Sequence, residues 1–200
     1  MPFVRVPDRE LYWNFICAEA NSSRYGAAYT DLTPRLLDLV KRGKHAEVAD
    51  EEWPVLKAAV IRLRRPLTEQ VVELGTDWYE GALPSPALES IRLLNYSPFV
   101  QLAPSRTLGE FVAALDAGKD PPGDEGFAQN YRRFRAEYDP ARVVGRPVLV
   151  GPKIVGPYTE IEGLTRMCTL ISKRRAGEPI SAEVPVLVGV CLQFDQWHWR

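Results

Sequence analysis

The sequence predicts an α+β fold in two parts: a helical N-terminal extension over residues 1–90, and a small mixed sheet with packed helices over residues 91–200. Apolar residues recur at helical spacing in the first part, whereas the last third alternates short valine-rich runs with helical segments. Hydrophobic residues make up 46% of the 200 residues, which is enough for a sizeable core.

Two helices are predicted in the extension. The segment 31–34 combines a capping residue with proline at the first helical position, and Gly43 ends this helix. A second helix begins near Asp50, and Pro66 ends or kinks it before residues 68–74 resume the helical pattern. No catalytic constellation occurs here, so the extension is expected to pack against the rest of the chain or to bind a protein partner.

The middle of the chain begins with a candidate strand at residues 91–94. The segment Thr107-Leu108-Gly109-Glu110 matches the S/T-x-x-E capping box, which predicts a helix over residues 107–117. A loop rich in proline, glycine and aspartate follows, and an amphipathic helix is predicted over residues 127–138.

Strands are predicted in the last third over residues 146–150, 158–161 and 184–190. The third is an unbroken apolar run, which is typical of a buried strand. A helix is predicted over residues 164–175, with Met167, Cys168 and Ile171 on its apolar face. Cys168 is therefore interpreted as a buried core thiol.

The sharpest candidate for chemistry is the segment Glu162-Gly163-Leu164-Thr165-Arg166, at the predicted strand-to-helix junction. A helix N-terminus presents unpaired N–H groups, and glycine lets a ligand approach the backbone closely. Arg166 adds a fork of donors that matches phosphate oxygens. The segment is interpreted as a phosphate cradle or, alternatively, as a glycine turn beside an exposed arginine.

Charge and cysteine content exclude several classes of protein. A net charge of −1 and a pI near 6.2 argue against a globally basic nucleic-acid binder. No apolar run approaches the roughly 18 residues of a membrane span, and no signal peptide is recognised, so no membrane association and a cytoplasmic location are expected. The three cysteines contain no CxxC pair and are interpreted as reduced thiols.

Several short motifs follow one another in residues 146–188: Arg146-Pro147-Val148-Leu149-Val150, a second strand, the turn Gly163-Leu164-Thr165-Arg166, and Val184-Pro185-Val186-Leu187-Val188. In this order they resemble the core of the ParB/sulfiredoxin-like superfamily, and the resemblance covers about residues 98–192. It implies a ParB/sulfiredoxin-like fold in which the G-x-x-R turn binds nucleotide phosphates. Members of this superfamily include CTP-hydrolysing partition proteins, sulfiredoxin and free-serine kinases.

By position, the resemblance implies that Gly163, Thr165 and Arg166 bind the phosphates of ATP, ADP or CTP, with Mg²⁺ expected. Ser105 and Arg106 either line the same cleft or form an ordinary helix cap. Glu162 is the first candidate for a catalytic, metal-holding carboxylate, and Glu160 is the second. Because the two are separated by one residue on a strand, both side chains are expected on the same face, within reach of one metal ion. The implied reaction is phosphoanhydride cleavage or phosphoryl transfer.

The chain also departs from the superfamily. Leu164 stands where sulfiredoxin has its cysteine, and Leu164 and Thr165 replace the two histidines of the kinases. Neither sulfinic acid reduction nor serine phosphorylation is therefore indicated specifically. The alternative is a non-enzymatic module of the same fold, which binds a protein partner through the helical extension or binds nucleic acid. Nucleic-acid binding is not favoured, and nuclease activity is the weakest interpretation.

Overall fold

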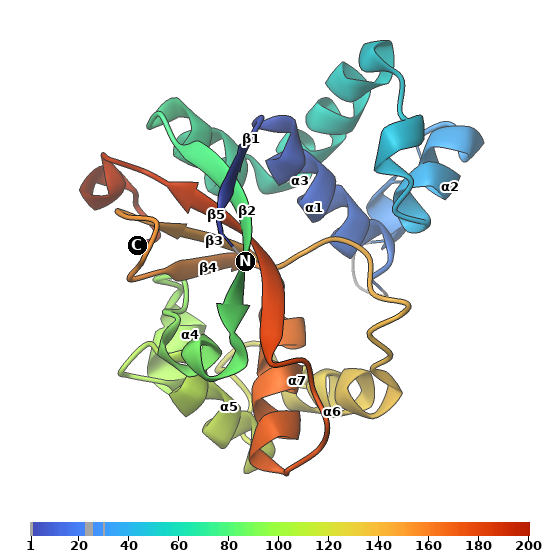
Figure 1. The fold of residues 1–200 in the computed structure, drawn as a ribbon. Coiled ribbons are helices and arrows are strands. Elements are labelled where there is room, and N and C mark those ends of the chain that lie inside the picture. Colours follow the sequence, from blue (N-terminus) through green and yellow to red (C-terminus); the bar gives the residue numbers. More distant parts are fainter. Residues whose placement is uncertain (1, 23–25, 30) are drawn as a thin grey trace.

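Five strands form one mixed sheet at the centre of the structure, a computed structural model that describes residues 2–22, 26–29 and 31–200 (Figure 1). The strands lie in the order β1-β2-β5-β3-β4, and neighbours are antiparallel except β3 and β5, which run parallel. Their bounds are β1 Val4–Val6, β2 Asp77–Pro84, β3 Val148–Gly151, β4 Thr159–Glu162 and β5 Glu183–Val190. The predicted α+β class is confirmed.

Helices cover both faces of this sheet (Figure 1). On one face lie α1 Arg9–Ala20, α2 Pro34–Lys41 and α3 Trp53–Glu73; on the other lie α4 Ser97–Leu102, α5 Leu108–Asp116, α6 Phe127–Glu137 and α7 Leu164–Arg175. Val148 and Val150 pack with the first set, and Leu149 packs with the second, because successive side chains of a strand point to opposite faces. The sheet thus separates two hydrophobic cores.

Local signals explain the ends of several helices. Thr33 precedes α2, and its hydroxyl accepts a hydrogen bond from the Leu36 N–H at 3.3 Å. Thr107 caps α5 in the same way, through the Glu110 N–H. Helix α3 is kinked at Arg64, two residues before Pro66, where the proline ring interrupts the helical hydrogen bonds. Short 3-10 helices span Gly26–Tyr29, His45–Glu47, Asp50–Glu52, Ser85–Ser90 and Phe194–Gln196.

Two features of the sheet differ from the expectations. Strands β1 and β2 come from the part of the chain expected to be helical, and β2 pairs along its whole length with β5. Strands from both sides of the expected boundary at residue 90 therefore share one sheet. The candidate strand at residues 91–94 makes only isolated bridges, in which Arg92 pairs with Thr107 and Thr159. No helix within the described residues is both long enough and apolar enough to cross a bilayer.

Candidate functional site

The turn between β4 and α7 is shaped by Gly163. Its backbone is left-handed, with φ +93°, and a Cβ at this position would lie 2.9 Å from the Cα of Pro147. Glycine is therefore required here by the packing of the turn against the residue that precedes β3. Thr165 lies partly exposed in the first turn of α7, and no side chain of the described residues caps this helix.

The two candidate carboxylates lie on opposite faces of the sheet, so the prediction of a shared face is wrong. Glu160 is paired with Leu149, whereas Glu162 is paired with Val148, and the ladder shifts between these pairs. Ile161 is the extra residue of this β-bulge, and a bulge interrupts the two-residue alternation of side chains. Glu160 consequently faces the core of α5–α7, and Glu162 faces α1 and α3.

Glu160 lies within the second hydrophobic core, with 2% of its surface exposed. Burial and, to a smaller extent, the negative charge of Glu162 together raise the pKa of Glu160 to about 8, while a hydrogen bond from the Leu94 N–H opposes the shift. Its Oε1 atom has no hydrogen-bond partner among the described residues. The group is therefore a neutral carboxylic acid near pH 7 rather than a metal ligand or a base.

Glu162 lies where β4 meets the N-terminal helices. Burial and, to a smaller extent, the Glu19 carboxylate of α1 together raise the pKa of Glu162 to about 7. Arg166 and Arg64 oppose the shift, as does a hydrogen bond from the Gly163 N–H. This carboxyl can exchange a proton near neutral pH, which a general acid or base requires.

Arg166 is bound to the protein itself. Its Nη1 donates to the carbonyl of Gly145 at 2.7 Å, and its Nη2 donates to the carbonyl of Val144 at 3.0 Å. Two of the donors expected to face phosphate therefore hold the connection between α6 and β3. Its Nε is buried and has no partner among the described residues.

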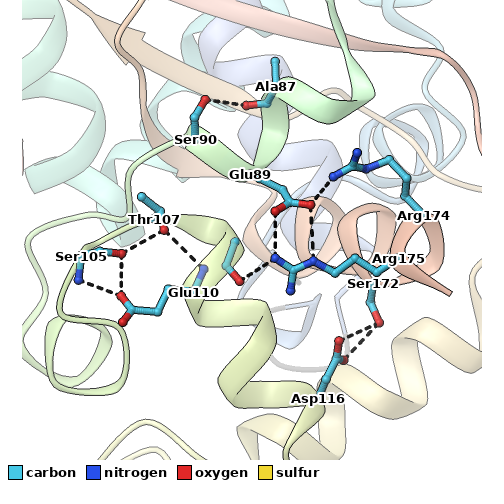
Figure 2. Close-up of polar contacts among 11 residues, drawn as sticks. Ala87, Glu89, Ser90, Ser105, Thr107, Glu110, Asp116, Ser172, Arg174 and Arg175 are labelled. Carbon is cyan, nitrogen blue, oxygen red and sulfur yellow. Dashed lines mark hydrogen bonds and ion pairs between the residues drawn. The ribbon is translucent and has the colours of Figure 1, made fainter.

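Ser105 and Arg106 do not join Arg166. The backbone N–H and hydroxyl of Ser105 both donate to Glu110, beside the Thr107 cap, as Figure 2 shows. Arg106 has a positive φ of 58° and donates to the carbonyl of Leu93 at 3.0 Å. Of the two interpretations of this segment, the contacts match the helix cap.

The positive side chains at the end of α7 are also paired. Glu89 accepts hydrogen bonds from Arg174 and Arg175, and Arg175 also donates to the carbonyl of Gly109 at 3.0 Å (Figure 2). Nearby, the hydroxyl of Ser172 donates to Asp116. These contacts join α7 to α5 and to the 3-10 helix before residue 91.

A cavity near the turn was not predicted from the sequence. A pocket of about 440 Å³ lies beside α7, between the connection from α6 to β3 and the first residues of β5. Its apolar lining includes Pro140, Pro147, Leu170, Ile180, Val184 and Pro185. Arg146, Arg166 and Lys173 also line it, and of the predicted site residues only Arg166 does so.

Two of the three cations that line this pocket form ion pairs with carboxylates. Arg146 forms an ion pair with Glu80, and Lys173 forms one with Glu178 at 2.7 Å. Each of these pairs is partly exposed, so an incoming anion competes with a carboxylate for the cation. Tyr138 also lines the pocket; burial raises the pKa of its phenol, and nearby Arg166 opposes that shift. The prolines that line this cavity, at positions 140, 147, 179 and 185, are too far apart in the sequence to have indicated it.

Comparison of the chain with protein-family models, with curated proteins and with solved structures gives no match. The resemblance to the ParB/sulfiredoxin-like superfamily therefore stays a prediction from the motifs alone. Within the described residues, no group of three or more His, Cys, Asp or Glu side chains can hold a metal ion. Because the bulge separates Glu160 from Glu162, this pair does not fit the predicted shared Mg²⁺ site.

Proposed function

We propose that the chain binds an organic anion with an apolar body, of the nucleotide class, in the pocket beside α7. The observation that carries this proposal is the pocket itself: about 440 Å³, lined mostly by apolar residues, with Arg146, Arg166, Lys173 and Glu183 as its charged ones. Ligand sites commonly have this size and combine apolar walls with a few charged groups that orient the ligand. Arg146 and Lys173 would bind the anionic group.

The nucleotide class is favoured within this description by the motif order around Arg166. That arginine is the one residue shared by the predicted phosphate-binding turn and the pocket. Mg²⁺ would arrive with the nucleotide, since phosphate oxygens and water supply most of its ligands in such complexes. Binding is the part of the predicted function that the pocket supports, since neither Glu162 nor Glu160 lines it.

Titration calorimetry with ATP, ADP, CTP and GTP, each with Mg²⁺, tests the proposal. Lys173→Gln and Arg146→Gln are expected to weaken the binding of the preferred nucleotide at least tenfold each, because hydrogen bonds between charged groups contribute about 1.5–3 kcal/mol. Glu80→Gln removes the competing carboxylate of Arg146 and is expected to tighten binding.

Arg133→Gln is the matched control, since Arg133 is an exposed arginine of α6 outside the pocket. Its nucleotide affinity is expected to equal that of the wild type. The proposal fails if none of the four nucleotides binds, or if the pocket variants and the control bind equally well. Product analysis of the bound nucleotide then distinguishes simple binding from hydrolysis.

A further inference from the structure

One wall of the pocket is the connection from α6 to β3, residues 138–147, called the strap below. It supplies Tyr138, Pro140, Val143, Gly145, Arg146 and Pro147 to the lining. The strap belongs to no helix or strand. In Figure 1 it runs from α6 past the N-terminal helices to the sheet. Its position therefore depends on contacts made by other elements.

Three consecutive strap residues are held by side chains of two different helices. From α7, Arg166 donates to the carbonyls of Val144 and Gly145. From α1, the Oδ1 of Asn14 accepts a hydrogen bond of 2.6 Å from the Arg146 N–H. The strap is thus fixed at the junction between the N-terminal helices and α7.

The side-chain amide of Asn14 is held in the orientation that this contact requires. It is 2% exposed, and its Nδ2 donates to the carbonyl of Glu10 at 2.7 Å, so its Oδ1 is directed to the strap. Gly145 fits closely against the same helix, because a Cβ there would lie 3.2 Å from the carbonyl oxygen of Asn14. Strap and helix α1 are therefore complementary in both hydrogen bonding and shape.

We propose that Asn14 and Arg166 are positioning residues, which hold the strap as the closed wall of the pocket. Helix α1 thereby controls the affinity of a site that it does not line. The proposal rests on the proposed function only for the identity of the ligand. The position of the strap does not depend on the proposed function. Loss of the Asn14 contact opens the strap, and an open strap removes one wall and the cation Arg146 from the ligand.

Trypsin cleavage after Arg142, an exposed strap residue, measures the opening. Asn14→Ala is expected to speed this cleavage five- to tenfold, as loss of one buried hydrogen bond predicts, with cleavage at other sites unchanged. Gly145→Ala, which displaces the strap without altering α1, is expected to do the same. A general loss of stability would instead speed cleavage at all sites together.

Asn21→Ala is the matched control, because Asn21 ends the same helix and its Nδ2 donates to the carbonyl four residues earlier at 2.9 Å. That side chain also donates to the carbonyl of Lys41 in α2, away from the strap. The Arg142 cleavage rate of this variant is expected to equal that of the wild type. The proposal is overturned if Asn14→Ala and Asn21→Ala give the same rate.

The second readout is the affinity for ATP with Mg²⁺, measured by calorimetry. Asn14→Ala is expected to weaken binding five- to tenfold and Asn21→Ala to leave it unchanged, while ATP slows Arg142 cleavage in the wild type. Faster cleavage without weaker ATP binding overturns the role of the strap as a pocket wall. Absence of ATP binding in the wild type contradicts the proposed function instead, and the cleavage rates alone then decide whether Asn14 holds the strap.

Discussion

A side chain at Gly163 would destabilise the fold for two separate reasons: the backbone is left-handed, and a Cβ would lie 2.9 Å from the Cα of Pro147. Gly177 shares only the first, since its φ is +71° and a Cβ added there would meet no atom within 4 Å. Gly163→Ala is therefore expected to lower the free energy of unfolding by about 1–3 kcal/mol more than Gly177→Ala. Urea denaturation measures both, and equal losses would show that the turn can move away from Pro147.

The contacts of Arg166 show why the sequence predicted this turn but not the backbone partners of its arginine. The strand, the glycine and the helix were all predicted from local signals. The carbonyls that Arg166 binds belong to Val144 and Gly145, whose position relative to the turn depends on the tertiary fold. The local sequence shows which hydrogen-bond donors an arginine has, but not whether other parts of the protein accept those hydrogen bonds.

Strand β4 carries two carboxyl groups into the interior, and their titration makes the stability of the protein depend on pH. The pKa of Glu160 is raised to about 8 in the folded state, from 4.5 when unperturbed. Between these values the folded chain keeps a proton that the unfolded chain releases, so stability falls as pH rises and levels off above about pH 8. The slope contributed by this group is at most about 1.4 kcal/mol per pH unit.

Urea denaturation at several pH values from 5 to 9 is the measurement. Glu160→Gln is expected to flatten the slope, whereas Glu137→Gln, on the exposed surface of α6, is expected to leave it unchanged. An identical slope in wild type and Glu160→Gln would mean that water or a structural change relieves the buried carboxyl.

Elements with local signals were predictable, and those that depend on distant partners were not. The caps at Thr33 and Thr107 and the valine-rich run of β3 identified their elements. Strand β2 contains Gly81 and ends at Pro84, both unfavourable in strands. A Cβ at Gly81 would lie 2.3 Å from the ring of Phe3, so this glycine makes room for a side chain that is remote in sequence.

The two hydrophobic cores share one sheet, so we expect them to unfold together. Cys17 is fully buried in the first core and Cys168 in the second. Burial raises the pKa of both thiols, which further suppresses the reactive thiolate. Variants that retain only one of these cysteines are expected to react with a thiol reagent at least about 10³-fold more slowly than an exposed thiol. The reaction rates of the two variants are expected to give the same free energy of opening.

Reaction rates followed against urea concentration provide the check. If Cys17 reacted through an opening of lower free energy than Cys168, the N-terminal helices would separate from the sheet on their own, and the two cores would unfold independently.

The central place of β5 also constrains how the protein is made. β5 is last along the chain among the five strands, yet it lies between β2 and β3 and pairs with both. Residues 77–84 and 148–151 are synthesised before residues 183–190, so the edges of β2 and β3 that pair with β5 have no partner in the chain until β5 is made. Such edges pair readily with other chains. Chains that lack residues 183–190 are therefore expected to aggregate more readily than the full sequence.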